Sequence, residues 1–113
     1  MLGIGLVSAL PTHSETLSEF YKDKKIQVFV GSGPGGGYDT YARMMGRHMG
    51  RHIPGKPTFL VKNMDGAGSI IAANYVYNVA PQDGTVIAAL QRNAPIVQIM
   101  GQKGPQFVAT KLN

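Results

Sequence analysis

Two glycine-rich runs carry the clearest chemical signal in this sequence. Residues 31–37 have the sequence GSGPGGG and residues 66–69 have the sequence GAGS. Glycine lets backbone amides approach a ligand closely, and a helix N-terminus favours anions through its unpaired N–H groups and partial positive charge. Because a helical pattern follows each run, the two runs predict a backbone cradle for a carboxylate or phosphate. The candidate ligand-binding residues are Gly33, Pro34, Gly35, Gly36, Gly37, Gly66, Ala67, Gly68 and Ser69.

Three charged residues stand close to these runs. Arg92 follows a predicted strand and can meet a carboxylate through two parallel hydrogen bonds, although a surface ion pair would explain it equally well. Asp39 lies in the first turn of a predicted helix, where a carboxylate is favourable, so we expect it to cap the helix rather than contact a ligand. Asp65 would repel an anion unless it caps a helix or pairs with a cation.

Other reactive side chains lack the partners that chemistry would require. His48 and His52 have the i, i+4 spacing of zinc ligands, but no third ligand is apparent. Ser32 and Ser69 have no plausible His–Asp partners for nucleophilic catalysis, and no two carboxylates are placed for acid–base work. The sequence therefore predicts no metal, no cofactor and no enzymatic activity.

A dinucleotide-binding enzyme is the main alternative. Gly31, Gly33 and Gly36 match the G-x-G-x-x-G fingerprint between a strand and a helix. The acidic partner of that fingerprint is expected about twenty residues further on, and Asp65 lies well past that position. Pro34 also falls inside the tight turn, so the match is weak. A nucleoside-triphosphate loop is excluded because no Gly-Lys-Ser/Thr follows.

Length and composition restrict the remaining classes. The 113 residues suffice for one domain with a modest core, and 43% of them are apolar. Lysine and arginine outnumber acids by 11 to 6, but the basic residues are scattered and no dense basic run is interleaved with aromatics, so no nucleic-acid partner is expected. Cysteine is absent, which excludes disulfides and thiol chemistry.

The N-terminal segment is apolar. Residues 2–10 are too few to span a membrane and resemble the hydrophobic part of a secretory signal without its usual basic start. We therefore expect residues 1–19 to be a clipped signal-like segment with a linker, and the protein to be exported to the periplasm. No further apolar stretch predicts a transmembrane segment, so the protein itself is not expected to span the membrane.

The remaining chain alternates strand and helix patterns. Short apolar runs predict strands at 26–30, 58–62 and 85–90, and helical periodicity predicts helices at 39–52, 69–79 and 95–100. The order β-α-β-α-β predicts an α/β fold with a parallel sheet and right-handed crossovers. Ligands of such sheets bind outside the carboxyl ends of the strands, where residues 31–37, 63–69 and 91–94 form the loops.

The periodicity also predicts which side chains are buried. The first helix should bury one face and expose its arginines, the third strand should be buried on both faces, and Ser69 should cap the second helix. The expected core residues are Tyr38, Tyr41, Ala42, Met45 and Met49 on the first helix and Ile71, Ala72, Tyr75, Val76 and Val79 on the second, with Arg43, Arg47 and Arg51 facing solvent.

Several short motifs resemble one known family. They are FYK at 20–22, VGSGPGGGYD at 30–39, YAR at 41–43, HIPG at 52–55, NM at 63–64, GAGS at 66–69, ANY at 73–75 and DGT at 83–85. The resemblance that these motifs carry extends over nearly all of residues 20–113. They resemble the Bug family, the extracytoplasmic solute receptors of tripartite tricarboxylate transporters.

This resemblance implies a two-lobed, Venus-flytrap binding protein that passes its ligand to a membrane permease. In that family, the loops after the first two strands hold a carboxylate through backbone groups and bridging water, and the ligands include di- and tricarboxylates, aromatic acids and amino acids. Asp65 departs from the family, which usually has proline there. From the resemblance to this two-lobed family, we expect residues 20–113 to be an incomplete first lobe that binds its ligand weakly or not at all when alone. A free-standing interaction module that pairs through an exposed sheet edge is a further alternative.

Overall fold

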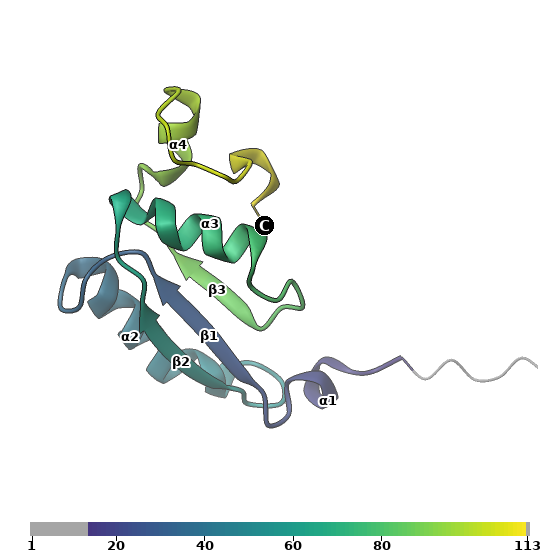
Figure 1. The fold of residues 1–113 in the computed structure, drawn as a ribbon. Helices are drawn as coiled ribbons and strands as arrows, with labels where there is room; N and C mark the ends of the chain where they lie inside the picture. The colour runs from purple at the N-terminus through teal and green to yellow at the C-terminus, as the bar shows by residue number, and fades with distance from the viewer. Residues whose placement is uncertain (1–13, 113) are drawn as a thin grey trace, which may run out of the picture.

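A three-stranded parallel sheet forms the centre of the computed structural model, which describes residues 14–112. The strands are β1 (Lys25–Val30), β2 (Thr58–Asn63) and β3 (Val86–Ala89), and they lie side by side in the order β2-β1-β3 (Figure 1). The predicted α/β fold with a parallel sheet is therefore confirmed. The first 13 residues of the predicted signal-like segment lie outside the described part of the chain.

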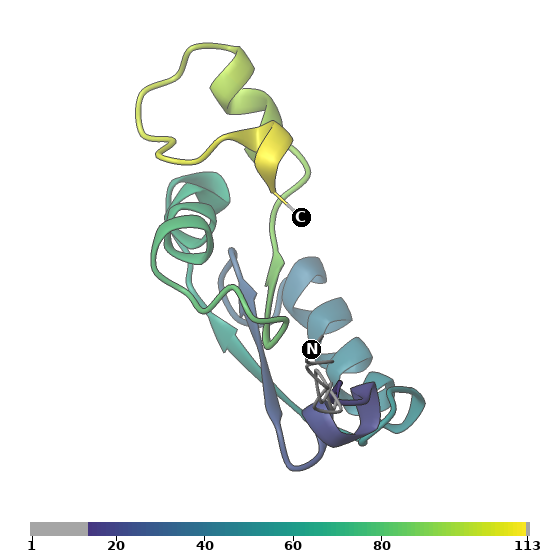
Figure 2. The ribbon, with the colours of Figure 1, turned by 90° about the vertical axis from the view of Figure 1, so that its right-hand side faces the viewer.

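Two helices cover opposite faces of the sheet. Helix α2 (Gly37–Met49) connects β1 to β2, and helix α3 (Ile70–Asn78) connects β2 to β3. Since β3 returns to the other side of β1, the two right-handed crossovers run in opposite directions and place their helices on different faces, as Figure 2 shows. A shorter helix, α4 (Ala94–Ile99), follows β3. All three helices therefore begin at the carboxyl edge of the sheet.

Within residues 14–112, buried hydrophobic residues form a small cluster on each side of the sheet. Val28 and Val30 of β1 pack against Ala42 of α2. On the other side, residues after α4 fold back onto α3, so that Phe107 is only 2% exposed and packs against Ile70. The segment after α4, residues 101–112, thus contributes to the core through Phe107, with the short 3-10 helix η3 (Ala109–Lys111) near its end.

One element was not predicted. Helix α1 (Leu17–Tyr21) begins at a capping box, in which the Glu19 amide donates to Thr16 Oγ1 (3.2 Å) and the Thr16 amide donates to Glu19 Oε2 (2.9 Å). The Tyr21 hydroxyl donates to the carbonyl of Gly84, just before β3. The spacing of Thr16 and Glu19 was the available signal.

The predicted core face of α2 is wrong. Only Ala42 is buried, whereas Tyr41 and Met45 are 68% and 49% exposed. They lie with Tyr38, Met49 and the sheet around an apolar cavity of about 400 Å³. These residues do share one face of the helix, as the periodicity predicted. However, α2 packs over β2 and β1, and no other described element covers the part of the sheet beside β3, so this helix face stays exposed.

Two further burial predictions also fail for the same reason. Ile71 and Val79 of α3 are 50% and 68% exposed. The predicted Ala72 is buried, together with Ile70 and Ala73, which were not predicted. In β3, Ile87 is 40% exposed, so this strand is not buried on both faces. A hydrophobic pattern predicts which residues can be buried, but only the packing partners decide which of them are.

Candidate functional site

The loops after all three strands meet at the side chain of Ser69. This residue is fully buried, and its Oγ donates to the carbonyl of Gly31 (2.7 Å) and accepts from the amide of Gln91 (2.9 Å). One hydroxyl therefore links residues 31–37, 63–69 and 91–94. The prediction that Ser69 caps α3 through its side chain is wrong: it occupies the N-cap position with a left-handed φ of 75° and makes no capping hydrogen bond.

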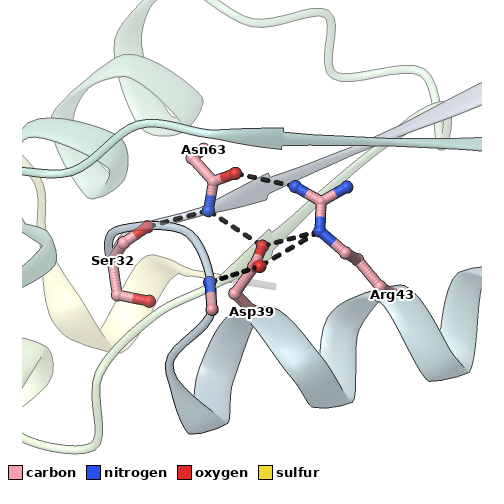
Figure 3. Close-up of polar contacts among 5 residues, drawn as sticks. Ser32, Asp39, Arg43 and Asn63 are labelled. Carbon is pink, nitrogen blue, oxygen red and sulfur yellow. Dashed lines mark hydrogen bonds and ion pairs between the residues drawn. The ribbon is translucent and has the colours of Figure 1, made fainter.

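A partly buried polar network holds the first glycine loop in place (Figure 3). Asp39 Oδ2 accepts from the amide of Gly35 (2.9 Å), and both carboxylate oxygens accept from Arg43 Nε (3.0 and 3.1 Å). Asn63 completes the network: its Nδ2 donates to Asp39 Oδ1 and to the Ser32 carbonyl, both at 2.9 Å, while its Oδ1 accepts from Arg43 (2.8 Å). The loop is thus tied to α2 and to the end of β2.

The Asp39 carboxylate forms its ion pair and hydrogen bonds with residues of this network, and we assign it no contact with a ligand. Its side chain is 4% exposed, and the amide of Gly35, followed by Arg43 and Asn63, lowers its pKa from 3.8 to about 2. Hydrogen bonds to a carboxylate favour its ionised form. Since Arg43 pairs with it, Asp39 does not leave an unbalanced negative charge beside the loop.

The Asp39 network should make stability depend on pH in the acid range. Because the pKa of Asp39 is about 2 in the folded chain and 3.8 ordinarily, its ionised form stabilises the fold above about pH 4 and loses this effect as the pH falls towards about 2. We expect Asp39→Asn to be less stable than the wild type at neutral pH, with the difference disappearing near the folded pKa. Urea unfolding of both proteins across this range measures it. A constant difference at every pH would contradict the assignment.

Arg43 and Asn63 are site residues that the sequence analysis missed. Arg43 was assigned to the solvent face of its helix, yet its side chain is only 42% exposed and bridges two polar partners. Its i, i+4 spacing from Asp39 was a usable signal. Asn63 carried no comparable signal, because its contact with Ser32 exists only once β1 and β2 are paired.

The second glycine loop has an unusual backbone. Gly66, Ala67, Gly68 and Ser69 have φ values of 143°, 48°, 62° and 75°. A positive φ at a residue other than glycine costs on the order of 1–3 kcal/mol and persists only where the surroundings enforce it. The buried hydrogen bonds of Ser69 provide such enforcement. The hydrogen bonds of Ser69 thus hold the backbone that leads into α3 in this conformation.

The first backbone amides of α2 lie at this edge, whereas the first amide of α3, that of Ile70, donates to the carbonyl of Ala67. The first N–H groups of a helix have no partner within the helix. Gly36 and Ser69 occupy the two N-cap positions, and neither provides a side-chain cap. Beside them, Ser32 Oγ is buried and has no hydrogen-bond partner within residues 14–112. The predicted residues Gly33 to Gly37 and Gly66 to Ser69 therefore lie on adjacent loops, as expected for the ends of paired strands.

Two charged residues flank the loops. The amide of Arg92 donates to the Tyr38 hydroxyl (3.1 Å), which ties the third loop to α2, while the exposed Arg92 side chain forms no ion pair with any described residue. Asp65 is exposed, and its Oδ2 lies 3.5 Å from the position a Gly33 side chain would occupy. At the margin of the site, Arg92 is thus a cation without an ion-pair partner among residues 14–112, and Asp65 is an exposed carboxylate.

Two other features bear on possible sites. No group of three potential metal ligands occurs within residues 14–112, and His52 instead accepts a hydrogen bond from Arg51 (3.1 Å). No helix in the same range is both long and apolar enough to cross a membrane.

Comparison with known proteins adds no assignment, since the sequence matches no protein-family model and no curated protein.

Proposed function

We propose that the carboxyl edge of the sheet binds a small carboxylate, and that the protein serves as a non-enzymatic solute receptor for a membrane permease. The arrangement of the loops supports the binding part of this proposal. The resemblance of its motifs to the Bug receptors supports the transport part and extends the proposal to the periplasm and to di- and tricarboxylates, aromatic acids or amino acids as ligands.

One observation carries the binding proposal. Strand β1 is followed by α2 on one face of the sheet, whereas β3 is followed by α4, whose Val97 packs with α3 on the other face, so the loops after the neighbouring strands β1 and β3 diverge at a topological switch point. Open parallel sheets bind ligands at such points. Here residues 31–37 and 91–94 flank this point, and the uncapped starts of α2 and α3 face the same edge.

The recognition chemistry follows from these groups. A carboxylate would accept hydrogen bonds from the first amides of α2, and the dipoles of α2 and α3 both favour negative charge at this edge. Arg92 can add a bidentate, charge-assisted contact. Ser32 Oγ is a buried hydroxyl without a partner and can reorient towards a ligand or a bridging water. Because the described loops would contact a ligand from one side only, we expect weak binding, with a Kd of about 1 mM.

The dinucleotide alternative has less support. In the dinucleotide-binding unit the first three strands lie in the order 3-2-1, whereas here β3 lies beside β1. The first glycine of the fingerprint, Gly31, also has a different explanation, because a side chain there would collide with Ser69. Binding of NADH, followed by fluorescence, would restore this alternative.

An amide-resolved NMR titration tests the carboxylate site. With succinate, citrate, glutamate or benzoate, we expect shifts in the amides of residues 33–37 and 66–69 and an apparent Kd near about 1 mM. Arg92→Ala should weaken binding about tenfold, since it removes the cation at the margin of the site. Lys103→Ala, which removes the same charge from another exposed position, is the matched control. If none of these acids moves a glycine amide at about 50 mM, roughly fifty times the expected Kd, the proposal fails.

A further inference from the structure

A basic groove lies on the opposite side of α2 from the apolar cavity, along the outer edge of β2. It has a volume of about 520 Å³, and its cations are Arg43, Arg47, Arg51 and Lys56, with no acidic residue in its lining. Arg43 is neutralised by Asp39, so three cations remain without an acidic partner among residues 14–112. Such a concentration of one sign attracts an oppositely charged partner.

Two glycines bring this arginine row close to the strand. A Cβ on Gly50 would lie 2.4 Å from the Pro57 carbonyl oxygen, and one on Gly46 would lie 3.1 Å from a Val61 methyl carbon. Larger residues at these positions would push α2 away from β2. The close approach leaves Arg47 and Arg51 beside the edge strand β2, whose Phe59 and Val61 line the same groove.

The outer edge of β2 also offers unpaired backbone groups. The Thr58 amide donates to Lys24 and the Met64 amide donates to Val30, so even-numbered residues of β2 direct their backbone groups towards β1. The amides and carbonyls of Phe59 and Val61 therefore point outwards, where no described strand pairs with them. An open edge of this kind can accept an added strand.

The spacing of the charges matches such a strand. Arg47 and Arg51 are one helical turn apart, which is a rise of about 6 Å. Alternate residues of a strand point to the same face and are about 6.6 Å apart. Acidic residues at alternate positions of a strand added to β2 would therefore meet successive arginines of α2.

We propose that the basic groove and the β2 edge together bind an extended peptide segment of a partner protein with acidic residues at alternate positions. Backbone hydrogen bonds to Phe59 and Val61 supply the strand pairing, and Arg47, Arg51 and Lys56 select the acidic side chains. Arg43 lines the groove and also pairs with Asp39 beside the first glycine loop. The residues proposed to contact the peptide nevertheless include none of those proposed to contact the carboxylate, so the two proposals can fail independently.

The test uses the whole chain and a short peptide in which glutamate alternates with valine. We expect saturable binding by fluorescence anisotropy, and slower hydrogen exchange of the Phe59 and Val61 amides in the complex. A peptide of the same composition with its glutamates in one block should bind about tenfold more weakly. N-methylation of alternate backbone nitrogens, which retains every charge, should abolish the exchange protection.

Charge reversal supplies the matched protein variants. Arg47→Glu with Arg51→Glu should weaken binding of the glutamate peptide at least about tenfold and create binding of a lysine–valine peptide. Lys103→Glu with Lys111→Glu changes the net charge equally at exposed positions outside the groove and should leave binding unchanged. The proposal is overturned if the glutamate peptide does not bind, if it binds without protecting Phe59 and Val61, or if a single-stranded oligonucleotide binds more tightly than the peptide.

Discussion

Replacing Gly31 with alanine is expected to lower the free energy of unfolding by about 3 kcal/mol. The new Cβ would lie 2.3 Å from Ser69 Oγ, 2.6 Å from its Cβ and 3.0 Å from its Cα. Rotating the serine cannot remove a collision that includes its backbone, and overpacking of this kind typically costs about 1–3 kcal/mol. Displacing Ser69 would also break its buried hydrogen bonds to Gly31 and Gln91, worth about 1–3 kcal/mol when their groups are left unsatisfied.

A double-mutant cycle separates this contact from a general loss of stability. Ser69→Gly removes the colliding side chain and suits the left-handed φ of 75°. In that background, Gly31→Ala should cost less, with a coupling energy of about 1–3 kcal/mol in urea unfolding. Gly37→Ala is the control, because no atom lies within 4 Å of its built Cβ, and it should change stability by less than about 0.5 kcal/mol. Additive effects of the two substitutions would show that the loops do not meet at Ser69.

The second large effect is expected at Phe107. Its ring is 2% exposed and packs with Ile70, Ala73 and Val97, far from it in the sequence. Truncating a buried phenylalanine to alanine costs about 3–5 kcal/mol, because it removes apolar contacts and leaves a cavity. For a domain whose total stability is about 5–15 kcal/mol, Phe107→Ala should shift the urea midpoint strongly or unfold the chain.

Two measurements make the Phe107 prediction specific. Ile99→Ala removes a side chain that is 83% exposed and should change stability by less than about 0.5 kcal/mol. Phe107→Leu, which keeps most of the apolar volume, should recover much of the loss. If Phe107→Ala unfolds at the same urea concentration as the wild type, the segment after α4 does not pack on α3.

Much of the fold could be predicted from local sequence patterns. The apolar runs and glycine turns located all three strands to within one or two residues, and their alternation with helices implied a parallel sheet. The glycine loops were placed correctly at its carboxyl edge, since strand ends of a parallel sheet must meet there. Asp39 was expected to cap its helix; it accepts a hydrogen bond from the amide of Gly35, the residue before the N-cap Gly36, and it also accepts one from the distant Asn63. Apart from the Asn63 contact, these features depend on residues within a few positions of one another.

Contacts between distant segments decided the rest. Ser69 was expected to cap its helix, but the approach of Gly31 and Gln91 uses its hydroxyl instead. Arg43 and Asn63 became partners only because β2 lies beside β1. Likewise, Tyr41 and Met45 have the periodicity of buried residues but remain exposed, because no described element packs over them. Local patterns determine which conformations and burials are favourable, whereas the tertiary structure alone determines which groups come within bonding distance.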